Sequence, residues 1–312
     1  MTSVESILVK AEALIEGLRA PDSISDLLAY PVRKARAHVD RNPEWPVLRL
    51  PLLTSQAFGC EPSVAQGLAL ASLLLYGFAD LTDDAQDGDL QGDWSWQRAV
   101  NAGNALLFLA HRKLLELPLA PERCNALTTA LTQAGIAMTF GQERDLLARY
   151  PQVPSVETYM ETIRGKSGAS AAFFASAAAI ATGQEPATRA ALHAYGECLG
   201  SYLQILSDAD AFAHADSSDL RNRNVTLPLI VALQPGKPAQ QELTAELEQA
   251  TSGSEIGRLV SESGGLMYAQ MKARMLQKNA MAHLADLPLD TDTRAALEGQ
   301  FRMPSRSTAY AL

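Results

Sequence analysis

The sequence predicts an all-α protein built as one large helical bundle. Apolar residues recur at the three- and four-residue spacing of a helix, as in the series Val4, Ile7, Leu8, Ala11 and Leu14. Alternating runs rich in Val, Ile and Thr, which would indicate strands, are scarce. Of the 312 residues, 47% are apolar and 20% are charged, so the chain can close a sizeable core and is too apolar to be disordered.

Helix-breaking residues divide the chain into segments of about 15 to 25 residues, from which we expect about ten helices or more. No linker rich in Ser, Gly or Pro separates two halves, so we expect residues 1–312 to form a single domain. The breakers lie at Pro21, residues 43–51, Pro62, residues 88–93, Pro118 and Pro121, and residues 151–154, 183–186, 235–238 and 252–254.

Composition excludes several classes of protein. With 26 basic and 35 acidic residues, a net charge of −9, the chain lacks the positive charge that a nucleic-acid partner requires. Cys60, Cys124 and Cys198 are too widely spaced for a disulfide framework or a cysteine zinc site. Residues 1–20 lack the basic start and apolar stretch of a signal peptide, and no uncharged apolar stretch is long enough to span a bilayer. We therefore expect a cytoplasmic protein without a membrane anchor.

Three carboxylates close the apolar helical run at residues 73–87. At about 100° per residue, Asp83 and Asp87 lie within roughly 40° of each other and Asp84 falls beside them. Like charges at a helix C-terminus repel one another and oppose the macrodipole, and a cation would relieve both effects. A few carboxylates with open positions suit Mg²⁺ that is also held by a substrate phosphate. From this segment alone, a solvated acidic helix end is the alternative.

A second acidic stretch, residues 204–219, follows the helical run at residues 195–205. Gln204 and Asp208 stand four apart, hence on one helix face. Two acidic helix ends of a bundle could face each other across a cavity and share metal ions, although this signal is weak by itself. Between the two stretches, Lys166 precedes the small-residue helix at residues 169–181, either as a surface charge or as a phosphate ligand.

The order of these segments resembles the trans-isoprenyl diphosphate synthases, also called polyprenyl synthetases. DDAQD at residues 83–87 is followed by GQERDL at 141–146, by YMETIRGKSGA at 159–169, by the second acidic stretch, and by DLRNRNVTLPLI at 219–230. The similarity covers roughly residues 48–233. It implies an all-α fold of the isoprenoid synthase type with a central active-site cavity, an allylic prenyl diphosphate as substrate, three Mg²⁺ ions bound with the diphosphate, and a homodimer.

The resemblance also implies roles for individual residues by their positions in the family's motifs. Phe78, five residues before Asp83, stands where the family sets the depth of the chain pocket, and Tyr76 offers a π face to a carbocation. The implied metal ligands are Asp83, Asp84, Asp87 and Asp208. The implied catalytic residues are Lys166, Gln142 and Gln204, and the implied substrate-binding residues are Tyr76, Phe78, Lys166 and Thr226.

The chain departs from the family where elongating members hold the diphosphate of the acceptor. The basic GGKxxRP-like segment is replaced by PEWPVLRLP at residues 43–51, where Arg49 is the only basic residue, and the Arg pair after the first motif is lost, leaving Arg98. A diphosphate is hard to hold without cations. The nearby basic cluster Arg33, Lys34 and Arg36 could replace them, although a solvated helix face is the expectation for that cluster.

The second aspartate-rich motif is eroded as well. Ser207, Asp208 and Ala211 occupy its three Asp positions, and Asn224 stands where the family usually has Lys. These changes put the third Mg²⁺ in doubt. The spacing cannot say which of Asp210, Asp216 and Asp219 would supply a replacement carboxylate.

A retained donor site and a lost acceptor site favour a terpene-synthase-like enzyme. We expect it to ionise a C15 or C20 allylic diphosphate with loss of pyrophosphate, followed by cyclisation or quenching by water. One alternative is head-to-tail chain elongation with isopentenyl diphosphate through an unusual acceptor site. Another is prenyl transfer to a peptide or other non-diphosphate acceptor, and a last one is an inactive partner of an active synthase.

Overall fold

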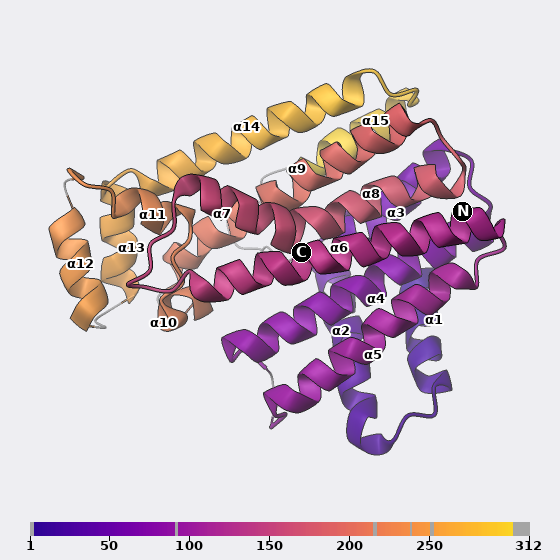
Figure 1. Cartoon of the computed structure of the whole chain (residues 1–312), viewed down its shortest axis with the longest axis horizontal. Helices are drawn as coiled ribbons and strands as arrows, with labels where there is room; N and C mark the ends of the chain where they lie inside the picture. Colours follow the sequence, from indigo (N-terminus) through magenta and orange to yellow (C-terminus); the bar gives the residue numbers. More distant parts are fainter. Residues whose placement is uncertain (1–2, 91–92, 215–216, 238, 250–252, 302–312) are drawn as a thin grey trace.

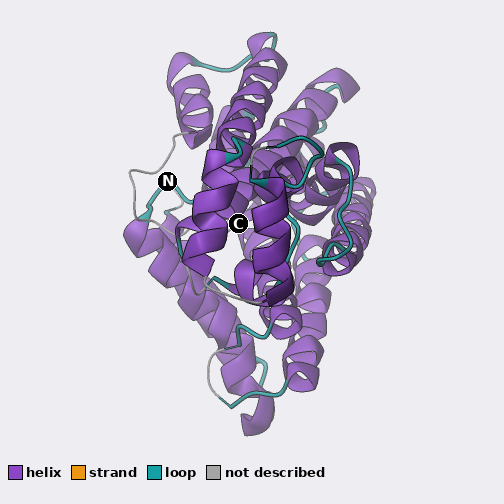
Figure 2. Ribbon diagram, turned by 90° about the vertical axis from the view of Figure 1, so that its left-hand side faces the viewer, coloured by secondary structure: helices purple, strands orange, loops and turns teal. Residues whose placement is uncertain are grey.

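The all-α prediction is confirmed. The computed structural model describes residues 3–90, 93–214, 217–237, 239–249 and 253–301, which form helices and no named strand (Figures 1 and 2). The helices are α1 (Val4–Gly17), α2 (Asp22–Arg41), α3 (Pro46–Ala57), α4 (Pro62–Asp87), α5 (Trp96–Leu115), α6 (Pro121–Leu147), α7 (Val156–Ile163), the π-helical turn η1 (Arg164–Gly168), α8 (Ala169–Ala181), α9 (Pro186–Asp210), the 3₁₀ turn η2 (Ala211–Ala213), α10 (Ser218–Asn222), α11 (Leu227–Ala232), α12 (Gln240–Gln249), α13 (Gly253–Glu262), α14 (Gly265–Ala285), α15 (Thr291–Glu298) and the 3₁₀ turn η3 (Gly299–Phe301).

Prolines start several helices, as the positions of the breakers predict. The helices α3, α4, α6 and α9 each begin at a proline, whose missing N–H is one that the first turn leaves unpaired anyway. The predicted break at residues 43–51 is wrong in part, because α3 begins at Pro46 and continues through Pro51. Val47, Leu48 and Leu50 are fully buried, so their packing outweighs the one backbone hydrogen bond that Pro51 cannot donate.

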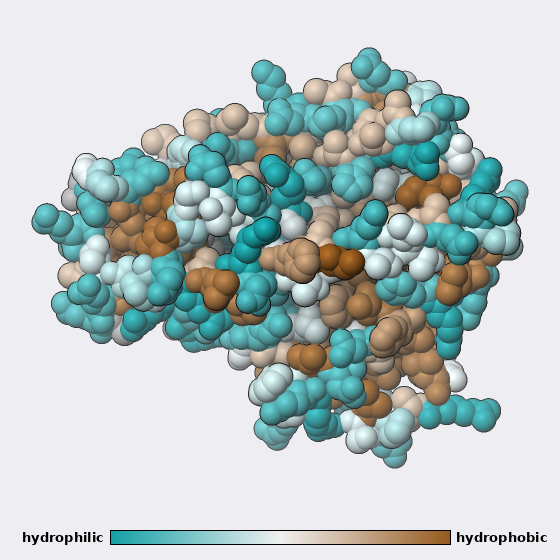
Figure 3. Space-filling view, in the orientation of Figure 1, coloured by the Kyte–Doolittle hydropathy of each residue, from teal (hydrophilic) through white to brown (hydrophobic). Residues whose placement is uncertain are grey.

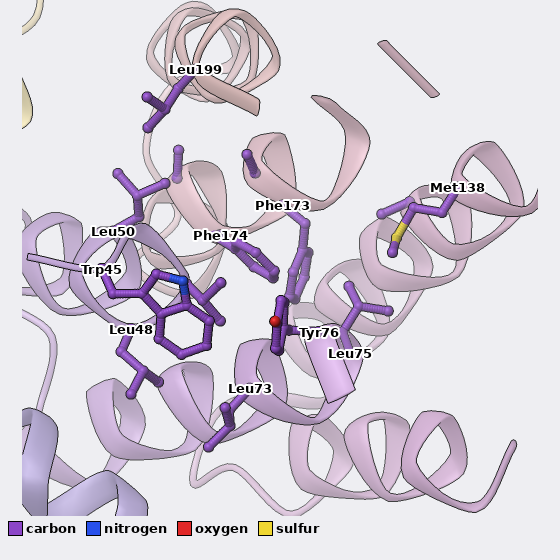
Figure 4. Packing of buried hydrophobic residues seen from close by; sticks show 14 of the residues in the cluster. Trp45, Leu48, Leu50, Leu73, Leu75, Tyr76, Met138, Phe173, Phe174 and Leu199 are labelled. Atoms are coloured by element: carbon purple, nitrogen blue, oxygen red, sulfur yellow. The ribbon is translucent and has the colours of Figure 1, made fainter. Parts of the chain in front are cut away.

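The Ala-rich helix α8 lies at the centre of the molecule. It packs against α3, α4, α6 and α9, and almost all of its residues are buried. Figure 4 shows Phe173 and Phe174 of α8 next to Tyr76 of α4, with Trp45 close by. The small residues of this helix therefore serve close helix packing.

Glycines on α9 allow its backbone to touch that of α8. A Cβ atom at Gly196 would lie 2.3 Å from the carbonyl oxygen of Ala171, and one at Gly200 would lie 2.3 Å from that of Ser167. Only a residue without a side chain fits such contacts. The approach fixes the position of α9 relative to the start of α8, where Lys166 precedes the helix.

Helix α4 is long and apolar enough to cross a membrane by length and mean hydropathy. In this fold it is a core helix, because 72% of its most apolar 18-residue window is buried inside the protein. It lies between α5 on one side and α3 and α8 on the other, and α2 also packs on it. In Figure 1, α2, α4 and α5 lie together in the lower half of the molecule. The carboxyl end of α4 carries the first three carboxylates.

Replacing Gly196 by Ala tests the contact between α8 and α9. We expect Gly196→Ala to lower the free energy of unfolding by about 1–3 kcal/mol, because the new methyl group meets backbone atoms that cannot give way. Gly135→Ala on α6 is the matched control, since a Cβ atom there meets nothing within 4 Å, and it should leave stability unchanged or raise it by up to about 1 kcal/mol. Urea unfolding of both variants measures the difference, and equal midpoints would contradict the close packing.

Candidate active site

A cavity of about 490 Å³ opens beside the carboxyl end of α4. Its wall combines carboxylates, amides and two lysines with an apolar part contributed by α4, α5, α6 and α9. The lining residues are Lys34, Tyr76, Phe78, Ala79, Asp80, Thr82, Asp83, Asp84, Gln86, Val100, Asn104, Met138, Thr139, Gln142, Glu143, Leu146, Lys166, Ser167, Ser170, Leu203, Gln204 and Ser207. Of the predicted site residues, Asp87, Asp208 and Thr226 do not line it.

The first three carboxylates share one helix end but have different partners. Helix α4 ends at Asp87 because Gly88 adopts the left-handed conformation, with φ of 75°. Asp83 accepts a hydrogen bond from Gln142 (Nε2 to Oδ1, 2.8 Å), and Asp87 pairs with Arg149 (Nη2 to Oδ1, 3.3 Å). Asp84 pairs instead with Lys34 on α2, at 2.8 Å. Asp83 and Asp87 therefore lie in one group of charges and Asp84 in a second, and the role of all three as metal ligands stays a prediction.

Lys166 lies among the carboxylates. Its Nζ atom is 2.7 Å from Asp145 Oδ2 and 3.0 Å from Asp83 Oδ1. It stands in the π-helical turn η1, and such turns are frequent at functional sites. A Cβ atom at Gly141 of α6 would lie 2.2 Å from the Lys166 backbone nitrogen, so the glycine allows the turn to approach α6. Burial lowers the pKa of Lys166, but Asp83 and Asp145 raise it more, and the lysine stays charged.

The end of α9 supplies a buried carboxylate on the other side of Lys166. Asp208 accepts hydrogen bonds from Tyr159 (Oη to Oδ2, 2.6 Å) and Gln204 (Nε2 to Oδ1, 2.7 Å). Gln204 in turn accepts one from Ser167, the residue after Lys166. Burial and the nearby Asp219 raise the pKa of Asp208 to about 8. The predicted pair Gln204 and Asp208 is thus connected directly to the turn that carries Lys166.

Asp219 is the carboxylate that the structure adds to this end, rather than Asp210. Asp210 is 38% exposed and faces His214 at 3.4 Å, and Asp216 lies outside the described residues. Asp219 accepts a hydrogen bond from Asn224 (Nδ2 to Oδ1, 2.8 Å). Burial raises the pKa of Asp219, and Asp145 and Asp83 add to the effect.

A short backbone pairing joins the two segments that carry Arg149, Asn224 and Thr226. Arg149 and Asn224 form an isolated antiparallel bridge, which brings the loop after α6 against the segment before α11. Arg149 Nε, Asn224 Oδ1 and the Thr226 hydroxyl are buried without a hydrogen-bond partner. Buried polar groups are almost always satisfied, so these three unpaired groups mark this pairing as an unusual part of the fold.

The site carries more negative than positive charge. Among the described residues, the five carboxylates Asp83, Asp87, Asp145, Asp208 and Asp219 and the two cations Lys166 and Arg149 sum to −3 when all seven groups are charged. Burial and the neighbouring Asp83 raise the pKa of Asp87 to about 7. Within the described residues, no three His, Cys, Asp or Glu side chains are arranged to hold a metal ion by themselves. The carboxylate oxygens of these residues are the kind of ligand that Mg²⁺ prefers, and phosphate oxygens of a substrate would be its further ligands.

The apolar part of the cavity contains the two aromatic residues expected there. Phe78 lines it, as its position before Asp83 predicts, and its role as the floor of the pocket stays a prediction. Tyr76 lines it too, but its hydroxyl donates to Asp80 Oδ1 at 2.8 Å and its ring packs edge-on against Trp45, with 4.9 Å between centroids. Tyr76 is therefore a wall residue fixed by the core.

Sequence reasoning missed several charged residues of the site. Asp145 and Tyr159 stand within the GQERDL and YMETIRGKSGA segments, so their motifs were recognised but the residues were not singled out. Asp80 lies inside the apolar run of α4. Its spacing of four residues from Asp84, which places both on one helix face, could have identified it. No local sequence pattern identifies Arg149, because it lies in the loop after α6 and reaches Asp87 only in the folded protein.

Comparison with known proteins agrees with this geometry. Residues 88–262 match the family model described as Polyprenyl synthetase. The chain is 28% identical to a short chain isoprenyl diphosphate synthase of Methanothermobacter thermautotrophicus, over 95% of this chain and 96% of the relative. It is 28% identical to a geranylgeranyl diphosphate synthase of Mycobacterium tuberculosis, over 77% and 74% of the two chains.

Solved structures give the same result. The crystal structure of a polyprenyl synthetase from Streptomyces coelicolor superposes with a TM-score of 0.76 at 25% identity, covering 96% of this chain and 98% of that one. A geranylgeranyl pyrophosphate synthetase from Geoglobus acetivorans, at 21% identity and a TM-score of 0.78, shares the fold over 95% and 96% of the two chains. The motif order, the helical fold and the family match together show that the chain belongs to the polyprenyl synthetases, the trans-isoprenyl diphosphate synthase family of class I isoprenoid synthases.

Proposed function

We propose that the protein is a Mg²⁺-dependent prenyl diphosphate synthase that joins an allylic prenyl diphosphate head to tail with isopentenyl diphosphate. The observation that carries the proposal is the cluster of Lys166 and carboxylates beside a cavity with an apolar wall. The relatives named as short chain isoprenyl and geranylgeranyl diphosphate synthases favour elongation over the cyclisation or hydration that the sequence analysis put first.

The residues around Lys166 suit the leaving diphosphate. Lys166 and Arg149 are the cations, and Gln142 is an amide donor now held by Asp83 and Gln86. Asp83 and Asp87 would hold Mg²⁺, which would supply positive charge for the departing pyrophosphate. Asp145 keeps Lys166 in place throughout, because it lies on α6 and is a second partner of the amine. Charges fixed in this way need no rearrangement as the bond breaks.

The apolar wall suits the prenyl chain. Tyr76, Phe78, Met138 and Leu203 lie beyond the carboxylates and present rings and aliphatic groups to the cavity. They exclude water from an allylic carbocation, and the aromatic faces stabilise its charge. We propose a C15 or C20 allylic diphosphate as the substrate.

One observation favours ionisation without isopentenyl diphosphate as a second candidate. In the segment at residues 43–51, Trp45, Val47 and Leu50 are buried. Arg49, its one basic residue, pairs with Glu44 at 2.9 Å and does not line the cavity. This segment therefore offers no cation to a second diphosphate. That fits a terpene-synthase-like enzyme, which does not bind isopentenyl diphosphate.

We further propose that the chain acts as one domain and forms a homodimer through α5 and α6. A single hydrophobic cluster includes residues from Ile7 in α1 to Phe301 in η3. Trp96, Phe108 and Leu115 of α5 and Ile136 and Phe140 of α6 are each at least half exposed, and apolar side chains are visible over these helices in Figure 3. A second copy of the chain would cover them.

The choice between elongation and cyclisation is tested by supplying isopentenyl diphosphate. Purified protein with Mg²⁺ and farnesyl or geranylgeranyl diphosphate should release pyrophosphate and form a longer prenyl diphosphate only when isopentenyl diphosphate is present. Asp83→Asn should lower the rate by at least about a hundredfold, since it removes a metal ligand of the leaving group, while Asp93→Asn on the exposed loop leaves it unchanged. Release without isopentenyl diphosphate, with a hydrocarbon or alcohol as product, would support the second candidate instead.

The raised pKa values of Asp87 and Asp208 make the metal-free protein sensitive to pH. The folded state binds these two protons more tightly than the unfolded chain does, so stability should fall as pH rises from about 4 through the folded values of about 7 and 8. We expect a lower melting temperature in EDTA at pH 8.5 than at pH 5.5. Mg²⁺ with inorganic pyrophosphate should raise the melting temperature more at pH 8.5 than at pH 5.5. Asp87→Asn should reduce the pH dependence. Equal melting temperatures at both pH values would contradict the raised pKa values of Asp87 and Asp208.

The homodimer is tested by a single charge on α5. Phe108 is 73% exposed, and Phe108→Glu should convert the protein to a monomer in analytical ultracentrifugation, because a buried unpaired carboxylate opposes association. Met267→Glu is the matched control, since Met267 is 72% exposed on α14, away from the proposed interface. A wild-type protein that sediments as a monomer, or dissociation by both variants, would overturn the assignment of this surface.

A further inference from the structure

Lys34 of α2 reaches the end of α4 and pairs with carboxylates other than those that hold Lys166. Its Nζ atom lies 2.9 Å from Asp80 Oδ1 and 2.8 Å from Asp84 Oδ2. Both carboxylates are held by tyrosines, since Tyr76 donates to Asp80 at 2.8 Å and Tyr30 donates to Asp84 at 3.2 Å. The side chain of Lys34 is 24% exposed and lines the cavity.

The other members of the basic cluster point away from the cavity. Arg33 pairs with Asp26 at the surface, where both side chains are more than half exposed, and Arg36 pairs with Glu5 and Glu12 of α1. The expectation of a solvated helix face therefore describes Arg33 but not Arg36, which faces α1, or Lys34, which faces α4. The reason is helical phase, because neighbouring residues of one helix point in different directions.

Lys34 and Lys166 have equivalent surroundings. Each amine is held between two carboxylates, Asp80 and Asp84 for Lys34, and Asp83 and Asp145 for Lys166. An ammonium group has three donors, so each lysine keeps one N–H for a further acceptor. Among the described residues that line the cavity, these two are the basic ones. Burial lowers the pKa of Lys34, but Asp80 and Asp84 raise it more, so the charge is permanent.

Elongation brings two diphosphates into one cavity, and each requires a cation. Lys166 serves the allylic diphosphate, whereas Arg49 is held by Glu44 and Arg98 is bonded to the carbonyl oxygen of Ser23. Neither arginine lines the cavity.

We propose that Lys34 binds the diphosphate of isopentenyl diphosphate and so replaces the basic residues missing from residues 43–51. This inference rests on the proposed elongation. Asp80 is a positioning residue in it. Its carboxylate is buried, with one oxygen lacking a hydrogen-bond partner, and it holds the amine at the cavity through Oδ1. Tyr76 and Tyr30 keep the two carboxylates, and therefore the amine, in place.

The test compares Lys34→Gln with Lys34→Arg and with Arg33→Gln, which removes a neighbouring charge that faces solvent. Lys34→Gln should raise the KM for isopentenyl diphosphate about tenfold or more, as the loss of a charge-assisted hydrogen bond predicts, and should change the KM for the allylic diphosphate by less than about threefold. Lys34→Arg should recover most of the affinity, and Arg33→Gln should match the wild type. Calorimetric titration of each variant with isopentenyl diphosphate and Mg²⁺ measures the same loss without turnover.

Removing Lys34 leaves the buried Asp80 carboxylate without a cation, so Lys34→Gln combined with Asp80→Asn provides a variant without that penalty. A wild-type KM for isopentenyl diphosphate in the folded double variant would overturn the role of Lys34 while elongation itself stands. An equal rise in both KM values would overturn it too, because Lys34 would then belong to the allylic diphosphate. A wild-type protein that neither binds nor consumes isopentenyl diphosphate would defeat the proposed elongation, and the inference with it.

Discussion

The active site depends on the position of Lys166 between carboxylates of different helices. Asp83 comes from α4 and Asp145 from α6, and without the amine between them these two groups would repel each other. A buried lysine with two close carboxylates is stable only when the geometry is maintained by the surrounding backbone. Gly141 maintains it by letting the π-helical turn touch α6, and Gly200 does the same on the side of α9. The closest helix contacts and the charge cluster are therefore one structural arrangement.

The cluster has more carboxylates than cations, and this imbalance together with burial raises the pKa values of its carboxyl groups. The pKa of Asp87 is raised to about 7 and that of Asp208 to about 8, chiefly by burial and then by neighbouring carboxylates. Such an arrangement costs folding free energy, and it is useful if the balance is restored by a ligand that brings cations. The unpaired polar atoms of Arg149, Asn224 and Thr226 lie on neighbouring segments, and Arg149 and Asn224 contact Asp87 and Asp219 of the same cluster.

Two lysines beside the end of α4 give the cavity two places for an anion. Each is fixed by an aspartate away from the proposed metal ligands, Asp145 for Lys166 and Asp80 for Lys34. This duplication offers a physical account of how a chain could handle two diphosphates after losing the basic segment at residues 43–51. The side chains of that segment are apolar and pack in the core shown in Figure 4. An acceptor diphosphate can still bind if Lys34 supplies the cation.

The sequence by itself determined the helices, their approximate ends and the order of the motifs, because apolar spacing, prolines and glycines act over a few residues. It also placed Asp83, Gln142, Lys166 and Gln204 in one site through the order of their motifs. The tertiary structure decided which charges meet: that Asp84 turns to Lys34 and away from Asp87, that Asp219 joins the site where Asp210 does not, and that Arg149 reaches Asp87. Helical phase fixes a side chain's direction about its own axis, but its partner depends on which helix packs there and how closely, and that is a property of the whole fold.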